Sequence, residues 1–287
     1  MLSKQDLLHR YAMWNDVESR IRQFFVERGF LEVRTPLLVA SPGMEPNLDP
    51  MEVGVKLTNP IQNIAAGLIT SPEYSMKKLL GAGMEKIFTI TPVFRNNESV
   101  NTTNLPEFMM LEWYAPGSYE DLMNETEELL HTVLEDDAVW PRLTHEEANV
   151  DENGDPHTDA TQFFVTHYPA KDASLAKMSD DGKTAQRFEA FSDGLELCNG
   201  FVELTDADEQ RKRFEAEQDE RRKLGKTIFP IDEDLLGAIG NIDQEVYGNA
   251  LGIDRLVMLK YGVKDIRDVQ LSSKSFGIDL DSIGSVQ

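Results

Sequence analysis

The N-terminal segment has the hydrophobic period of an amphipathic helix. Ser3 and Asp6 form a capping-box pattern at its start. Gly29 is a plausible C-terminal stop, and an extended segment with a proline follows at residues 30–36. One helix face is predicted from residues that recur at steps of three and four: Leu7, Tyr11, Trp14, Val17, Ile21 and Phe24.

The rest of the chain alternates between strand-like and helical patterns. Residues 41–66, with prolines at 42, 46, 50 and 60, read as loop and short strand. We predict helices at 73–81, 118–135, 206–224, after Asp232 and at 254–261, and strands at 87–91, 107–115, 162–167, 187–204 and around Gly248. Residues 136–160 read as an acidic connecting loop. The pattern favours a single α+β domain over residues 1–287, with a mainly antiparallel sheet and helices packed around it.

Residues 107–115 are predicted to form a strand with one polar face and one more apolar face. Phe108, Met110, Glu112 and Tyr114 share one face. A carboxylate and a phenol in line are expensive to bury without partners. They suit a cleft in which a flat ring stacks on Phe108 and a cationic amine meets Glu112 and Tyr114. A half-exposed strand with ordinary surface residues is the alternative.

Two arginines and three glutamates form a second candidate site. Arg95 follows a strand and Arg255 opens the last helix, so the pair could clamp a triphosphate. Glu189, Glu196 and Glu203 recur every seven residues, and carboxylates of this type suit Mg²⁺. The alternatives are ordinary surface arginines and a solvated acidic hairpin.

Composition and charge narrow the class of protein. The chain has 287 residues, 40% of them apolar, and one cysteine, which fits a reducing compartment. No run of 18 apolar residues exists, so we expect a soluble cytoplasmic protein without a membrane partner. The formal net charge of −23 repels a polyanion such as tRNA, although a salt-rich habitat would also select an acidic surface.

Several motifs, in fixed order, resemble those of class II aminoacyl-tRNA synthetases. Residues 29–36 resemble the first signature motif, Phe94-Arg95 with 106–114 the second, and 248–256 the third. Further matches lie at 71–80, 166–169, 187–189 and 230–232. The resemblance covers nearly the whole chain except residues 137–160. It implies an antiparallel sheet flanked by helices.

Within that class the chain is most similar to the elongation factor P–lysine ligases, stand-alone paralogues of lysyl-tRNA synthetase. It starts directly at the motif 1 helix, so no anticodon-binding domain is expected. The resemblance implies ATP-dependent activation of lysine or (R)-β-lysine as the adenylate, followed by transfer to a lysine of elongation factor P rather than to tRNA. It also implies a homodimer built on motif 1, where Trp14, Phe24 and Phe25 exceed what one helix face needs.

The resemblance also implies roles for individual residues, with Arg95 and Arg255 as catalytic groups. The expected amino-acid contacts are Ser71, Pro72, Glu73, Glu112, Tyr114, Glu203 and Ala250. The expected ATP contacts are Arg95, Asn96, Asn97, Glu98, Asn104, Phe108, Glu196, Leu197, Gly252 and Arg255. Glu189 and Glu196 would hold Mg²⁺.

Two features of the sequence qualify these roles. Ala250 stands where lysyl enzymes have glycine and would favour (R)-β-lysine. The motif 2 loop is one residue longer than the family pattern, so either Asn97 or Glu98 fills its glutamate role. Another acceptor, tRNA or a small molecule, and a non-catalytic regulatory paralogue are the remaining alternatives.

Overall fold

An eight-stranded sheet organises the chain. The computed structural model describes residues 3–270 except 60, 100, 153 and 174, so the predicted domain 1–287 extends beyond the described residues at both ends. The strand order is β1-β5-β6-β11-β10-β9-β8-β7. The two outer pairings, β1–β5 and β7–β8, are parallel, and every pairing between them is antiparallel. The predicted α+β architecture is therefore confirmed.

Most of the predicted elements are present within a few residues of their expected bounds. The helices are α1 (Lys4–Glu27), α2 (Glu73–Gly81), α3 (Tyr119–Leu134), α4 (Ala207–Lys223), α5 (Glu233–Ile239) and α6 (Ile253–Tyr261), with short 3₁₀ turns η1 (Ala170–Asp172) and η2 (Ile266–Asp268). The strands of the large sheet are β1 (Leu31–Glu32), β5 (Ile87–Phe94), β6 (Glu107–Pro116), β7 (Arg142–Thr144), β8 (Gln162–Thr166), β9 (Arg187–Ser192), β10 (Leu195–Val202) and β11 (Val246–Gly252). A separate small sheet has the order β2 (Leu38–Val39), β4 (Ile61–Leu68), β3 (Glu52–Thr58). No helix in the described ranges is both long and apolar enough to cross a membrane.

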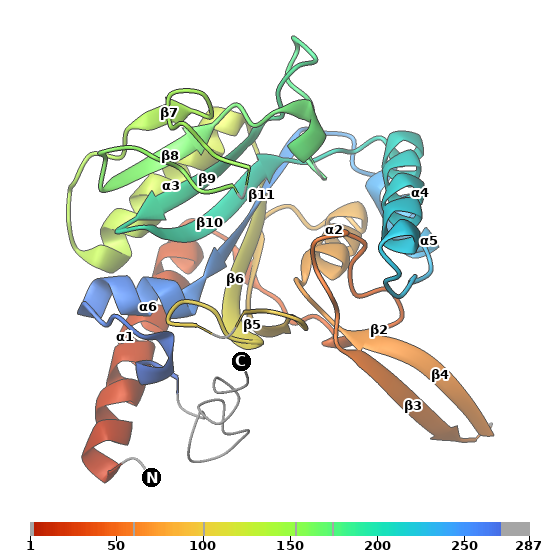
Figure 1. The fold of residues 1–287 in the computed structure, drawn as a ribbon, viewed down its shortest axis with the longest axis horizontal. Coiled ribbons are helices and arrows are strands. Elements are labelled where there is room, and N and C mark those ends of the chain that lie inside the picture. The colour runs from red at the N-terminus through yellow and green to blue at the C-terminus, as the bar shows by residue number, and fades with distance from the viewer. Residues whose placement is uncertain (1–2, 60, 100, 153, 174, 271–287) are drawn as a thin grey trace.

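Two groups of helices flank the large sheet (Figure 1). Helices α1, α3 and α6 bury one face in the main hydrophobic core, where the Phe25 ring stacks on Phe88 at 5.0 Å and meets Trp113 at 5.3 Å. Helices α2, α4 and α5 form a second cluster, in which Tyr74 lies 5.6 Å from Phe214. The polar face of β6 is thus left free of the main core.

Helix α1 confirms its predicted capping box but not all of its predicted face. Tyr11 is 48% exposed, and burial begins at Met13. Trp14, Phe24 and Phe25 are all buried in the core of their own chain. The expectation that these three aromatic residues supply a dimer interface is therefore wrong.

Two segments predicted as loop contain strands. Residues 41–66 were expected to be loop and short strand, but β3 and β4 form a long hairpin that projects away from the large sheet (Figure 1). Its projection leaves β3 side chains exposed or half-buried, although the apolar residues Val53, Val55 and Leu57 occupy every second position of the strand. Within residues 136–160, β7 pairs in parallel with β8, and Trp140 is buried beside Phe164.

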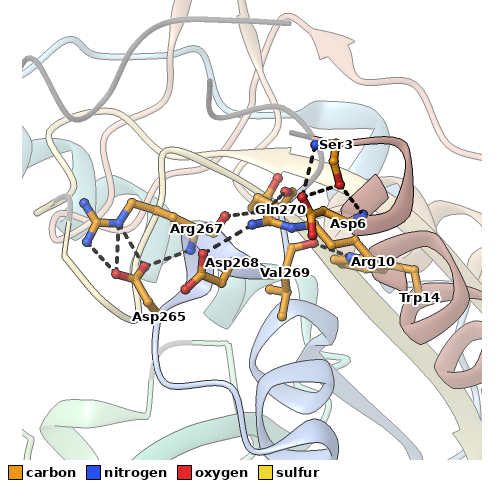
Figure 2. Close-up of polar contacts among 9 residues, drawn as sticks. All are labelled: Ser3, Asp6, Arg10, Trp14, Asp265, Arg267, Asp268, Val269 and Gln270. Atoms are coloured by element: carbon orange, nitrogen blue, oxygen red, sulfur yellow. Dashed lines mark hydrogen bonds and ion pairs between the residues drawn. The ribbon is translucent and has the colours of Figure 1, made fainter. Parts of the chain in front are cut away.

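The last described residues are fastened to α1 (Figure 2). Trp14 Nε1 donates a hydrogen bond to the Val269 carbonyl oxygen at 2.8 Å. Arg10 Nη1 donates to the carbonyl oxygens of Arg267 and Gln270 at 2.7 and 2.6 Å. These bonds hold residues 267–270 across the first turns of the helix.

Candidate active site

Strand β6 presents its predicted polar face to a buried pocket. Leu111 and Trp113 lie in the main core, as alternation requires, and Glu112 points the other way with 1% exposure. The Tyr114 hydroxyl donates to Glu112 Oε2 at 3.0 Å, and the Ser71 hydroxyl donates to Glu112 Oε1. Two of the predicted amino-acid contacts, Ser71 and Tyr114, thus converge on a third, Glu112.

The burial of Glu112 and its two neighbouring carboxylates would stabilise a cation bound beside it. Burial raises the pKa of Glu112 to about 8, and repulsion by Glu73 and Glu203 adds to the shift. Hydrogen bonds from Ser71 and Tyr114 oppose it. An ammonium group placed here would relieve the desolvation and the repulsion together.

Glu73 and Glu203 meet on a buried lysine that the sequence interpretation did not single out. Lys77 Nζ lies 2.6 Å from Glu73 Oε1 and 2.5 Å from Glu203 Oε2, and its side chain is 2% exposed. Burial lowers the pKa of Lys77, but the two carboxylates outweigh this and raise the pKa above its usual range. The i,i+4 spacing of Glu73 and Lys77 was a signal in the sequence, yet it marks many exposed helix pairs as well. Pro72 is buried at the N-cap of α2, and the Glu73 N–H donates to Ser71 Oγ at 3.0 Å.

Strand β11 lies beside β6 in the sheet and extends the same wall. Gly248 pairs with Tyr114, and Ala250 pairs with Glu112. A Cβ atom at Gly248 would lie 2.3 Å from Tyr114 Cε1 and 2.5 Å from Glu203 Oε1, so only glycine fits there. Gly248 is therefore the neighbour of Glu203, and the Ala250 methyl lies on the pocket face of the sheet, directly across from Glu112.

Arg255 is fixed at the edge of this pocket by three hydrogen bonds. Nη1 donates to the Glu196 carbonyl oxygen at 2.6 Å, Nη2 to Asn104 Oδ1 at 2.7 Å, and Nε to the Thr103 carbonyl oxygen at 3.3 Å. A Cβ atom at Gly252 would meet nothing within 4 Å, so the space beside it is open. The structure therefore brings three of the predicted ATP contacts together, Arg255, Asn104 and Glu196.

Arg95 and Phe108 form the other side of the same region. The Arg95 guanidinium lies 5.1 Å from the centre of the Phe108 ring, and the Arg95 N–H donates to the Pro106 carbonyl oxygen at 2.8 Å. The loop that follows is tied to Asp49: the Asn96 N–H donates to its carbonyl oxygen and Asn97 Nδ2 to its carboxylate at 2.8 Å. The Asn97 side chain thus holds this loop against Asp49.

One predicted contact, Leu197, is placed differently from its neighbours, and the cysteine that follows it is also buried. The Leu197 side chain is 2% exposed within the main core, so only its backbone can face a ligand. Cys198 is buried on the core side of β10, where Asn249 Nδ2 approaches its sulfur at 3.6 Å. It does not line the amino-acid pocket.

Glu189 and Glu196 lie on neighbouring strands of the β9–β10 hairpin. Burial raises the pKa of Glu189 to about 7, and repulsion by Glu196 adds to it. Tyr168 donates to Glu189 at 2.6 Å, and Arg187 forms an ion pair with it at 2.5 Å. Mutually repelling carboxylates fit a divalent cation. Within the described residues no group of three or more His, Cys, Asp or Glu side chains forms a complete metal cage.

A separate depression of about 430 Å³ opens beside this site. Residues 36–42 and the starts of α2 and α5 line it, and Ser71 is the one predicted contact that reaches it. It does not include Glu112, Arg95 or Arg255.

The sequence was compared with known proteins. The family model "tRNA synthetases class II (D, K and N)" matches residues 2–275. The elongation factor P–(R)-β-lysine ligase of Proteus mirabilis is 38% identical and covers 88% of this chain and 91% of its own. The enzyme of the same name from Yersinia enterocolitica is 36% identical over 92% of this chain and 93% of its own. The chain therefore belongs to the class II aminoacyl-tRNA synthetase family and, within it, to the elongation factor P–(R)-β-lysine ligases, which makes it an ATP-dependent amino-acid ligase.

Proposed function

We propose that this chain activates lysine or (R)-β-lysine as an adenylate and transfers the aminoacyl group to a lysine side chain of elongation factor P in the cytoplasm. The observation that carries this proposal is the buried cluster of Glu73, Glu112 and Glu203 around one lysine, Lys77. A pocket with more carboxylates than cations suits a substrate with two ammonium groups. The names of the relatives support the same substrate and acceptor.

The activation step follows from the charges at the site. The amino-acid carboxylate, already ionised, attacks the α-phosphorus of ATP; a P–O bond forms, and the bond to pyrophosphate breaks. Arg95 and Arg255 offset the charge that develops on the phosphoryl oxygens. The adenine ring is expected to stack on Phe108, and the ribose and backbone contacts to involve Gly252 and Leu197.

Glu98 is the better candidate for the motif 2 glutamate. Asn97 already donates to Asp49, whereas Glu98 follows it in the same loop as a half-buried side chain. Glu189 and Glu196 would hold Mg²⁺, which supplies charge neutralisation to the phosphates when bound.

Transfer completes the reaction. A lysine amine of the acceptor attacks the adenylate carbonyl carbon, an amide forms, and AMP leaves with the bonding electron pair. The formal net charge of −23 disfavours tRNA as the acceptor. We also propose a symmetric homodimer, because Leu8, Val26 and Leu31 of the motif 1 region are 61, 60 and 57% exposed.

Pyrophosphate exchange over a panel of amino acids tests activation, and mass spectrometry of elongation factor P incubated with enzyme, ATP and amino acid tests transfer. We expect exchange with lysine-type substrates and a mass increase of one aminoacyl group on the acceptor. Exchange at background with both lysine isomers would overturn the activation step. Efficient charging of tRNA-Lys with an unmodified protein acceptor would overturn the choice of acceptor.

A further inference from the structure

Lys77 occupies the centre of the amino-acid pocket yet has no role in the reaction described above. Its ammonium contacts one oxygen of each flanking carboxylate, Glu73 Oε1 and Glu203 Oε2. It also lies 5.6 Å from the centre of the Phe201 ring. A lysine buried this completely is held by its partners rather than by solvent.

The contacts of Lys77 determine which carboxylate oxygens stay available. Because Lys77 takes Glu203 Oε2, the other oxygen, Oε1, is directed at Gly248, where a Cβ atom would approach within 2.5 Å. Glu203 Oε1 is buried and accepts no hydrogen bond from the described residues. A buried carboxylate oxygen without a donor is an acceptor prepared for a ligand.

Charge counting leads to the same conclusion. Glu73, Glu112 and Glu203 outnumber the one cation among them, Lys77. Burial raises the pKa of Glu112 and of Glu203 to about 8, so a substrate with two ammonium groups would favour the ionised forms of both. Lys77 lowers the pKa of Glu203, against burial and repulsion by Glu73. Without Lys77, Glu203 would keep its proton to a higher pH and would offer the substrate one acceptor fewer.

We propose that Lys77 is a positioning residue, which holds the carboxylates of Glu73 and Glu203 in place and turns Glu203 Oε1 towards the substrate ammonium. The proposal rests on the proposed activation of a lysine-type amino acid. The groups that face Lys77 are Glu73 on its own helix and Glu203 directly after β10. Glu112 on β6 interacts in turn with both of these glutamates. Lys77 makes no contact with the reacting atoms in this scheme.

Two variants test the proposal in the full-length protein. Lys77→Met removes the charge and keeps the length of the side chain. Lys77→Arg keeps the charge but replaces the compact ammonium group with a planar guanidinium group. Lys78→Met is the matched control, because Lys78 is the next residue of α2 and its ion pair with Asp232, at 2.6 Å, is partly exposed. KM for the amino acid, KM for ATP and kcat are measured by pyrophosphate exchange between pH 6.5 and 9.

We expect both Lys77 variants to raise the amino-acid KM by about tenfold or more, with KM for ATP and kcat within about threefold of wild type. For Lys77→Met the KM should recover at higher pH, as the protonated glutamate ionises, and Lys78→Met should resemble wild type. If Lys77→Met does not fold, the Lys77→Arg result decides. The positioning role would be overturned if a folded Lys77 variant had an unchanged amino-acid KM. It would also be overturned if the amino-acid KM and the ATP KM rose, and kcat fell, by the same factor. A wild-type protein without exchange would instead overturn the proposed function.

Discussion

The carboxylate of Asp254 joins two distant parts of the chain. Its Oδ2 accepts a hydrogen bond from the Met109 N–H at 2.7 Å, and its Oδ1 accepts one from Gln270 Nε2. Asp254 is 1% exposed and immediately precedes Arg255, while Met109 immediately follows Phe108. One buried side chain therefore keeps the two sides of the proposed ATP site in register.

Asp254→Asn should loosen this connection. The amide keeps the shape but replaces one acceptor oxygen with a donor, so a buried N–H loses its partner at a cost of about 1–3 kcal/mol. We expect a lower free energy of unfolding in urea and a higher KM for ATP. Asp268→Asn is the control, because Asp268 is 68% exposed in its pair with Arg10. Equal stability of the two variants would contradict a special role for Asp254.

The pocket should titrate near neutral pH. The folded-state pKa of Glu112 is about 8, above its usual 4.5. Its contribution to stability is therefore full below about pH 4.5 and is lost as the pH rises through 8. We expect the melting temperature of the free protein to fall from pH 6 to 9, and the stabilisation by lysine to grow over the same range, because ionised Glu112 binds the ammonium. If the increase in melting temperature caused by lysine did not change with pH, the role of ionised Glu112 in binding the ammonium would be contradicted. Glu112→Gln should reduce the response, and Glu203, whose pKa burial also raises to about 8, should account for the remainder.

Arg255 should be indispensable as a guanidinium. Its anchors on Glu196 and Asn104 fix its orientation, and a fork of this geometry matches phosphate oxygens. Arg255→Ala should reduce pyrophosphate exchange by at least about tenfold. Arg255→Lys should restore little of it, since an ammonium cannot replace three anchored nitrogens. Arg211→Ala, which removes an exposed pair with Glu233, is the control. Wild-type exchange by Arg255→Ala would exclude the clamp.

Local patterns predicted the parts of the site that lie on regular strands. The period of β6 separated Glu112 from Trp113, and the glycines of β11 marked the strand paired with it. Lys77 could not be predicted in the same way. Its burial depends on Glu203, which is far away in the sequence, and a Glu–Lys pair at i,i+4 is normally a solvated helix face.

The errors in the fold have a related cause. The alternation of Val53, Val55 and Leu57 along β3 was a strand signal, but the prolines at 50 and 60 on either side favoured a loop. The aromatic residues of α1 exceeded one helical stripe, which suggested a partner chain. Instead Phe24 and Phe25 fill the space between the helix and Phe88 of the sheet.

The dimer prediction now depends on the exposed apolar side chains of the motif 1 region. Val26 at the end of α1 and Leu31 in β1 are 60 and 57% exposed. We expect a dimer mass by light scattering at micromolar concentration, and a monomer mass for Val26→Glu/Leu31→Glu, because the same patch meets itself across a two-fold axis. Leu224→Glu, at an exposed site after α4, is the control. A monomeric wild-type protein would contradict the prediction.

Ala250 should set the choice between the two lysine isomers. Its methyl lies on the pocket face of β11, opposite Glu112, beside the apolar group of Val93 and Met110. In α-lysine the amine is attached next to the carboxylate, and in β-lysine it is one carbon further on, so a methyl that crowds the first position penalises the α-isomer. A single methyl in a tight pocket is worth about 1–3 kcal/mol of discrimination.

Ala250→Gly should therefore raise kcat/KM for α-lysine relative to β-lysine by about tenfold or more, measured by pyrophosphate exchange with each isomer. Cys198→Ala is the control, because Cys198 faces the core on the other side of the sheet and should leave the ratio unchanged. An unchanged ratio in Ala250→Gly would move the source of the preference away from β11. The carboxylates of Glu73 and Glu203, held by Lys77, would then be the groups that distinguish the two isomers by the position of the amine.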